Sequence, residues 1–455
     1  MTPSQTIMAG FAVMILIGSL LLSLPIASRS GESIGFLNAL FTATSANCVT
    51  GLVVVNTMEH WTLFGKIVIL ALIQFGGLGF MAVMTVTMLF LKRQITLRNR
   101  RAIQASFNQD SIGGMVTLVK KVVLFTLVME AVGAALLAIS FFAGGAMPAG
   151  EAAYQGIFHA ISAFCNAGFD NIGPDGMVPF QSNVPVNLVL MALIILGGLG
   201  FTVLAELWQN IKNPQKKSLR YRMVHISLHS KIVLVMTAAL TVGGAALFLA
   251  LEWSNGATLG PLPALGKMQA ALFQSVTLRT AGFNTIRQDG LTEMSQAISC
   301  LFMLIGGSSA STAGGIKTVT LGVILFSMLS VLRGRNKLEA FGRTLPLDLL
   351  QKALTVVSTM LIVVFVSTFV LYFTEQANPY PHTLLDLLFE SCSAAGTVGV
   401  STGITHHLSP AGKIVIIICM YLGRLSPVTV VVALNARLHK HADGIGYPRE
   451  RVIIG

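Results

Sequence analysis

Four short glycine-centred segments have the residue types needed to hold a cation that has lost its water. Each follows an apolar stretch too brief to cross a membrane and precedes a longer one. Backbone carbonyls presented there could replace the water around a potassium ion, and glycine readily permits the turned backbone that exposes them. The candidate filter residues are, in chain order, Val49, Thr50, Gly51, Asn166, Ala167, Gly168, Thr280, Ala281, Gly282, Thr397, Val398 and Gly399.

The central glycines of these segments recur at a nearly constant interval. They are Gly51, Gly168, Gly282 and Gly399, with separations of 117, 114 and 117 residues. A fixed period in a long chain indicates a repeated structural unit. One such segment surrounds nothing by itself, whereas four in one chain can close a ring. We therefore expect a pseudo-fourfold pore.

A second group of glycines, called here the second glycine signal, lies about 25 residues after each central filter glycine. We attribute its members in the first two repeats to close packing within continuous spanning helices, because small residues let helices approach one another. These are Gly76, Gly77, Gly197 and Gly198. In the third repeat the signal is longer and interrupts the apolar run 295–332, which as one helix would be about 57 Å long. A helix of that length is too long for one span.

This interruption is expected to be a broken intramembrane loop that lies below the filter and can obstruct the axis. Glycine costs roughly 1 kcal/mol relative to alanine within a helix, and small hydroxyl side chains can satisfy exposed backbone groups. A tight packing face is the alternative. The candidate gate residues are Gly306, Gly307, Ser308, Ser309, Ala310, Ser311, Thr312, Ala313, Gly314, Gly315, Lys317 and Arg424.

The elements that must position these residues are membrane helices. The 455 residues are 54% hydrophobic and 11% charged, with a mean hydropathy of +0.76, a composition typical of an integral membrane protein. We predict an all-α membrane protein of four helix–pore-loop–helix repeats, with eight transmembrane helices and four re-entrant pore helices. The apolar runs long enough to cross the membrane are 7–27, 66–91, 115–142, 187–208, 232–251, 295–332, 354–373 and 413–436.

The repeats divide the chain into five predicted units. They are repeat 1 over 1–91, a basic cytoplasmic loop and repeat 2 over 92–211, a cytoplasmic loop and repeat 3 over 212–332 with the intramembrane loop 306–315, a cytoplasmic loop and repeat 4 over 333–436, and a cytoplasmic tail over 437–455. Most of the 30 Lys and Arg residues lie between repeats or in the tail. Because cytoplasmic loops collect basic residues, we expect both termini in the cytoplasm. The filter side is net acidic, which would concentrate cations there or form an ordinary solvated rim.

Two features inside apolar runs need a separate interpretation. The first run lacks the basic start and cleavage site of a signal peptide, so we expect a retained helix. Glu130 lies in the third run, where an ionisable group is costly. It serves ion transfer or, as we favour, is neutral or bonded to a neighbouring helix.

Other classes of function find little support in the sequence. The five cysteines and nine histidines lack the spacing of a metal or redox site, and no nucleophile–base constellation indicates an enzyme. Neither the glycines around Gly77 nor the segment around Lys317 has the context of a nucleotide-binding motif. The net charge of +12 reflects topology, so no nucleic-acid partner is expected.

The four units and their filter motifs resemble the Trk/Ktr/HKT superfamily, and within it the membrane subunits of bacterial Ktr potassium uptake systems. The resemblance covers essentially the whole chain. The residues that carry it are Thr50-Gly51, Asn166-Ala167-Gly168-Phe169, Arg279-Thr280-Ala281-Gly282-Phe283-Asn284, Gly396-Thr397-Val398-Gly399 and the run 306–317.

The resemblance implies a potassium-translocating subunit of the cell membrane. Such a subunit works as a homodimer on a cytoplasmic ring of nucleotide-binding, RCK-type regulatory subunits. It needs no cofactor of its own: potassium is the substrate, sodium an activator, and the nucleotide is bound by the regulatory partner. The resemblance also implies that Arg424 is a positive charge below the filter that restricts flux, with a structural ion pair as the alternative. Lys317 has an analogous position or faces the cytoplasm.

Two other functions fit parts of the pattern. One is a sodium-permeable or weakly selective member of the same superfamily. Serine at the first filter accompanies sodium preference in the plant HKT branch, whereas this chain has Gly51. The other is an unrelated secondary transporter with inverted repeats, which is disfavoured because all four units are predicted to start on the same side of the membrane.

Overall fold

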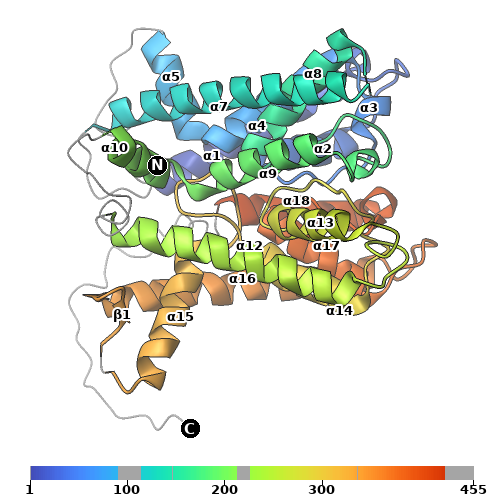
Figure 1. Cartoon of the computed structure of the whole chain (residues 1–455). Coiled ribbons are helices and arrows are strands. Elements are labelled where there is room, and N and C mark those ends of the chain that lie inside the picture. The colour runs from blue at the N-terminus through green and yellow to red at the C-terminus, as the bar shows by residue number, and fades with distance from the viewer. Residues whose placement is uncertain (1, 91–113, 146, 213–225, 336, 426–455) are drawn as a thin grey trace.

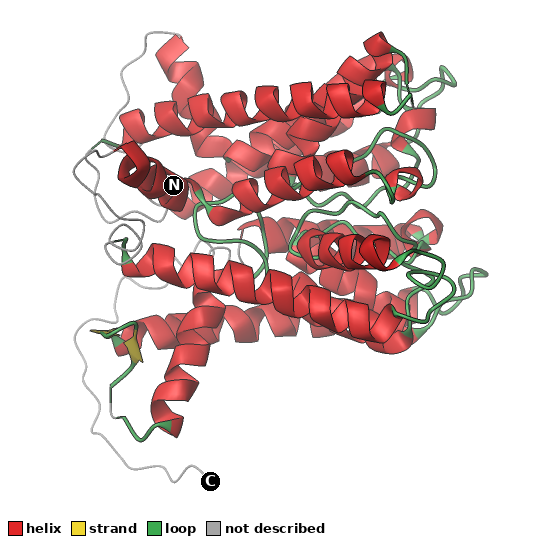
Figure 2. Ribbon diagram, in the orientation of Figure 1, coloured by secondary structure: helices red, strands yellow, loops and turns green. Residues whose placement is uncertain are grey.

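The chain folds into a bundle of helices that run between two ends of the molecule (Figure 1 and Figure 2). The computed structural model describes residues 2–90, 114–145, 147–212, 226–335 and 337–425. Much of the first two predicted cytoplasmic loops, the end of the predicted span 413–436 and the tail 437–455 lie outside the described residues.

Each repeat begins with a long apolar helix. These helices are α1 (Pro3–Leu22), α7 (Met115–Ala143), α12 (Leu228–Glu252) and α16 (Leu347–Thr374). A capping box between Thr2 and Gln5 starts α1, and the Ser227 side chain caps α12. In the described part of the chain, these four are the unbroken helices that are long and apolar enough to cross a membrane.

A short helix follows each long one and ends at a filter segment. The short helices are α2 (Phe36–Asn47), α8 (Ala149–Phe164), α13 (Ala264–Thr277) and α17 (Leu384–Gly396). With 12 to 16 residues each, none can span the hydrocarbon core. The chain partners α1 and α2, α7 and α8, and α12 and α13 pack against each other. The predicted alternation of spanning and re-entrant helices is confirmed.

The remaining member of each repeat is an apolar helix, which is broken in the first three repeats and is described only as far as Leu425 in the fourth. These elements are α4 (Leu63–Leu78), α5 (Phe80–Phe90), α9 (Val184–Leu199), α10 (Phe201–Lys212), α14 (Glu293–Leu304), α15 (Thr318–Leu332) and α18 (Pro410–Leu425). Helices α4 and α5 meet at 102°, as do α9 and α10. The prediction of continuous helices over 66–91 and 187–208 is wrong, because Gly79 (φ +82°) and Gly200 (φ +90°) leave the helical conformation.

In repeat 3 the break is longer. Residues 305–317 leave the helix between α14 and α15, so the predicted interruption of the run 295–332 is confirmed. A parallel bridge between Ile305 and Ile316 joins the two ends of this segment.

The second glycine signal brings these helices close to the pore helices. A Cβ on Gly76 would lie 2.0 Å from the carbonyl oxygen of the last residue of α2, and one on Gly197 equally close to that of α8. A Cβ on Gly77 would lie 2.6 Å from the Cys165 Sγ. The predicted packing role is confirmed for these three glycines. Gly198 differs, since its nearest contact would be at 3.5 Å.

Short elements occupy the connections. They are η1 (Pro25–Ala27), α3 (Thr57–His60), η2 (Val178–Phe180), η3 (Ile404–His407), β1 (Glu339–Ala340) and β2 (Arg343–Thr344). The two strands pair antiparallel. Their two-residue turn, Phe341-Gly342, has positive φ at both positions, as a type I′ hairpin requires.

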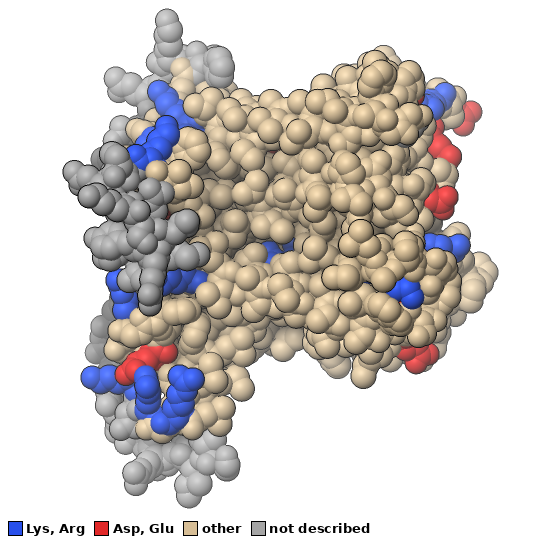
Figure 3. Space-filling model, in the orientation of Figure 1, with Lys and Arg blue, Asp and Glu red and all other residues tan. Residues whose placement is uncertain are grey.

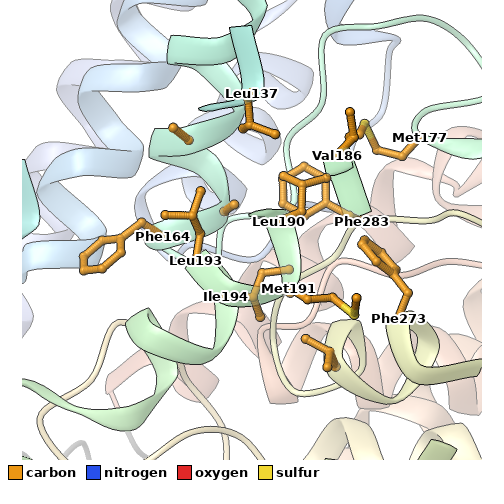
Figure 4. Packing of buried hydrophobic residues seen from close by; sticks show 14 of the residues in the cluster. Leu137, Phe164, Met177, Val186, Leu190, Met191, Leu193, Ile194, Phe273 and Phe283 are labelled. Carbon is orange, nitrogen blue, oxygen red and sulfur yellow. The ribbon is translucent and has the colours of Figure 1, made fainter. Parts of the chain in front are cut away.

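Apolar packing joins neighbouring repeats, and the outside of the bundle is apolar as well. Figure 4 shows Phe164 of α8, Ile194 of α9 and Phe273 of α13 within one buried cluster, which links repeats 2 and 3. On the face in Figure 3, charged side chains gather at the two ends of the molecule and leave an almost uncharged belt between them. Large apolar residues such as Phe365 are exposed on this outer surface, as expected for a multi-pass membrane protein.

Candidate functional site: a ring of four glycines

The four candidate filter segments meet in one closed ring. A Cβ added to any central glycine would collide with the carbonyl oxygen of the residue before the next repeat's glycine. The pairs, glycine first, are Gly51 and Ala167 (2.6 Å), Gly168 and Ala281 (2.8 Å), Gly282 and Val398 (2.6 Å), and Gly399 and Thr50 (2.0 Å). Because the fourth repeat contacts the first, the ring has no open side. Only glycine leaves room for this approach.

The backbone conformation of the ring is the same in all four repeats. Each central glycine has positive φ, and so does the residue two positions before it. Those preceding residues are Val49 (57°), Asn166 (57°), Thr280 (67°) and Thr397 (54°). A residue other than glycine costs about 1–3 kcal/mol in such a conformation. Because all four non-glycine residues adopt the same unfavourable positive φ, the surrounding protein must impose this backbone conformation.

Hydroxyl groups at the ends of the pore helices hold this shape. In repeat 1 the Gly51 N–H donates to Ser45 Oγ, and in repeat 4 the Gly399 N–H donates to Ser393 Oγ, both at 3.1 Å. In repeats 2 and 3 the hydroxyl instead donates to the carbonyl after the glycine, at 2.7 Å. These donors are Ser162 and Thr277. These four hydroxyl residues could have been found by extending the repeat alignment five or six residues upstream of each central glycine.

The filter segments offer several oxygen atoms as possible ligands. Besides their carbonyls, the hydroxyls of Thr50, Thr280 and Thr397 are buried and have no hydrogen-bond partner among the described residues. Uncharged oxygens are the ligands that alkali cations accept in place of water. The site can therefore hold a dehydrated cation.

A cavity of about 380 Å³ lies on one side of the ring and reaches all four central glycines. Asp170, Asp175 and Asp289 line it together with Arg287. Burial raises the pKa of Asp170 to about 7. The Arg287 guanidinium, 2.7 Å from Asp289, holds the pKa of Asp289 below its usual value. The mouth of the cavity thus carries both fixed and titratable negative charge.

The segment 305–317 lies on the opposite side of the ring and is anchored to repeat 2. The N–H groups of Ser308 and Thr312 donate to Gly198 O (2.8 Å) and Gly197 O (3.2 Å). In the other direction, the Phe201 N–H donates to Ala310 O at 2.9 Å. These bonds are possible because α9 ends at its glycines and leaves backbone groups free.

The same segment also touches the filter residues of repeat 4. A Cβ on Gly314 would lie 2.0 Å from Thr397 Oγ1, and Gly315 lies close to Gly396 O. Below the ring, segment 305–317 therefore lies against Thr397 and is anchored by hydrogen bonds to the broken helix of repeat 2. Ten of the candidate gate residues, 306–315, belong to this segment between α14 and α15.

The two cationic gate candidates both bind backbone carbonyls. Arg424 donates from Nη1 to Thr312 O and from Nη2 to Gly76 O, so it ties the segment to repeat 1. The ion pairs of the described residues do not include Arg424. Lys317 is half-buried and donates to Ala313 O at 2.7 Å. Its ammonium group is therefore turned toward the segment.

Glu130 is bonded to a neighbouring helix, as favoured above. Its carboxylate accepts a hydrogen bond from Gln74 of α4 at 3.2 Å and contacts the Cys165 thiol. Arg279 is a buried group that stands out in the sequence only as part of the third filter motif. Its position directly before the third filter was a visible signal, but its partners lie on other helices and could not be read from the sequence.

Comparison with known proteins identifies the family. Residues 1–441 match the TrkH family, described as cation transport proteins. The chain is 40% identical over 455 residues to the potassium/sodium uptake protein NtpJ of Enterococcus hirae, covering all of this chain and 98% of the relative. It is also 40% identical over 454 residues to the Ktr system potassium uptake protein B of Bacillus subtilis, covering all of this chain and 97% of that protein.

A solved structure supports the fold. The crystal structure of the potassium transporter TrkH from Vibrio parahaemolyticus superposes with a TM-score of 0.72, covering 95% of this chain and 86% of that one at 18% identity. At this identity the likeness concerns the fold alone. The full-length matches and the closed ring together show that the chain belongs to the TrkH family of membrane cation transport proteins.

Proposed function

We propose that this protein is the ion-translocating subunit of a potassium uptake system in the bacterial cell membrane. The observation that carries the proposal is the closed ring in which each central glycine faces the carbonyl oxygen of the next repeat. Four equivalent segments offer a cation several carbonyl oxygens at once, and these can compensate the loss of its water. The residues proposed to bind potassium are the twelve filter candidates from Val49 to Gly399.

The ring of filter segments and the acidic cavity favour a potassium pathway in which ions enter from the cavity side. Carboxylates at the mouth raise the local cation concentration, and the ring then replaces water. The names of two relatives, a potassium/sodium uptake protein and a Ktr system potassium uptake protein, support potassium as a substrate. A weakly selective or sodium-permeable transporter is the second candidate. The name of one relative, a potassium/sodium uptake protein, supports this candidate.

Gating is proposed to reside in the segment 306–315 with Lys317 and Arg424. The segment lies against Thr397 and is fixed by hydrogen bonds to Gly197 and Gly198. Small residues allow it to change conformation, and the bonds to Arg424 hold it in the obstructing one. Opening would then require that these few hydrogen bonds exchange for others.

The partners and orientation are part of the same proposal. The protein acts as a homodimer with a cytoplasmic ring of RCK-type subunits that bind the nucleotide, and sodium activates transport. Ktr system membership of a relative supports a partner subunit. We also propose that both termini lie in the cytoplasm. Basic side chains, which gather in part at one end of the molecule in Figure 3, support this orientation.

Potassium uptake in a cell that lacks its own uptake systems tests the proposal. The full chain should restore growth at low potassium, with greater uptake when sodium and a co-expressed regulatory subunit are present. Sodium uptake that equals potassium uptake would favour the weakly selective candidate. Absence of any cation uptake by a correctly inserted protein would contradict both.

A further inference from the structure

Arg279 is a buried cation immediately before the third filter segment. Its side chain is 4% exposed. Nη1 donates to Thr237 O and to Thr241 Oγ1, both at 3.1 Å and both on α12. The ion pairs found in the described part of the chain do not include Arg279. The guanidinium therefore pins the residue before Thr280 to the long helix of its own repeat.

The other side of the guanidinium faces the second repeat. A Cβ on Gly198 would lie 3.9 Å from Arg279 Nη2 and 3.5 Å from the side-chain amide of Asn166. The Asn166 amide is satisfied when its nitrogen donates to Ala163 O (3.0 Å) and Ile194 O (3.2 Å). That orientation leaves the amide oxygen on the side of Gly198 and Arg279. A planar guanidinium can donate toward α12 and toward this oxygen at once.

A purely structural role does not account for this arrangement. Burying a charge without a carboxylate partner is costly, and Nε of Arg279 has no hydrogen-bond partner among the described residues. An apolar side chain would fill the same space without that cost. The charge is placed where Asn166 and Thr280 both hold positive φ, two filter residues whose shape must be maintained.

We infer that Arg279 is a positioning residue for cation discrimination: it holds the third filter segment on α12 and aligns it with Asn166 of the second segment. The inference rests on the proposed function and deepens it. It predicts that losing the donors of Arg279 lowers selectivity for potassium over sodium while some transport persists. The change to lysine should keep only part of that selectivity, because an ammonium can still donate toward α12 but lacks the planar fork that also faces Asn166.

The experiment compares four variants of the full-length protein in proteoliposomes, with uptake of potassium measured in competition with sodium. Arg279→Met removes every donor and Arg279→Lys keeps a cationic donor. Thr241→Val removes one acceptor of Nη1, whereas Thr237→Val is the matched control, since the Thr237 hydroxyl has no partner among the described residues and only its carbonyl binds Arg279. Size-exclusion chromatography establishes that each variant is folded.

We expect the potassium-to-sodium uptake ratio to fall roughly tenfold in Arg279→Met, the order associated with losing one charge-assisted hydrogen bond. Arg279→Lys should give a ratio between those of Arg279→Met and the wild type, and Thr241→Val should lower the ratio while Thr237→Val does not. Equal ratios for Thr241→Val and Thr237→Val would overturn the inference, even if Arg279→Met failed to fold. A wild-type protein that shows no preference for potassium would instead count against the proposed function.

Discussion

The missing Cβ of Gly399 would lie 2.0 Å from the carbonyl oxygen of Thr50, so the last repeat closes the ring against the first. Gly399→Ala must displace that carbonyl, and we expect potassium uptake to fall to background or to lose its preference over sodium. Uptake with competing sodium measures both. Gly403→Ala is the matched control, because Gly403 also has positive φ (+103°) but has nothing within 4 Å of a Cβ. Equal loss in both variants would indicate backbone strain rather than ring closure.

The hydrogen bonds of Arg424 predict a restraint on flux. Arg424→Gln shortens the side chain and removes the charge that binds Thr312 O and Gly76 O. We expect potassium flux to rise roughly tenfold, since bonds from a charged donor contribute about 1.5–3 kcal/mol each. Proteoliposome flux is the measurement, with the exposed Arg333→Gln as the control. Unchanged flux in the Arg424 variant would remove this residue from the gate.

A deletion within the loop tests gating more directly. Removing residues 308–313 eliminates the bonds of Ser308 and Thr312 to α9 and leaves the ends of α14 and α15 in place. Potassium flux should increase and depend less on the regulatory subunit. Flux that stays normal and regulated in a properly folded deletion would refute the gating role.

The titration of Asp170 predicts a dependence of uptake on external pH. Burial raises its pKa to about 7, so the carboxyl is neutral at lower pH and negative at higher pH. The potassium concentration for half-maximal uptake should therefore decrease as pH rises through about 7. Asp170→Asn should abolish this dependence, whereas Asp175→Asn, in the same cavity, should retain it. A dependence that survives in Asp170→Asn would assign the titration to another group.

Glu375 joins the end of α16 to the start of α18 and should matter for stability. It accepts hydrogen bonds from Ser409 N (3.0 Å), Ser409 Oγ (2.6 Å) and Asn378 (2.7 Å). Glu375→Gln should lower the free energy of unfolding by about 1–3 kcal/mol, measured by thermal unfolding in detergent. The exposed Glu293→Gln is the control, and equal stability of the two variants would contradict the prediction.

The same carboxylate has a defined pH dependence. Burial raises the pKa of Glu375, but the hydrogen bonds from Ser409, Asn378 and Thr374 outweigh it, so the pKa lies below its ordinary value. Its contribution to stability is therefore present above the pKa of the unfolded chain, about 4.3, and is lost as pH falls below that value. The Gln variant should show a smaller loss of stability on acidification.

The sequence predicted the parts of the fold that depend on neighbouring residues. The apolar runs, the short pore helices and the position of each central glycine follow from composition, length and the period near 117 residues. The break between α14 and α15 was predictable because its ten small residues disfavour a helix locally.

Features that depend on distant repeats could not be predicted in this way. Val49 is a β-branched residue with a φ of 57°, which local preference opposes. The bends at Gly79 and Gly200 were not predicted, because the sequence does not show whether a glycine lies within a helix or ends it. The contacts of Arg279 with Thr241 likewise join residues whose proximity only the folded repeats create.

The ring-closing contact between repeats 1 and 4 has a consequence for the assembly of the protein in the cell. Synthesis proceeds from the N-terminus, and domains generally fold in that order. Three inserted repeats leave one wall of the filter missing beside Thr50, and the carbonyl oxygens there face no partner. A nascent chain therefore has no complete ion pathway until α17 and Gly399 arrive. A product that is truncated before the last repeat would therefore lack one of the four walls of the filter.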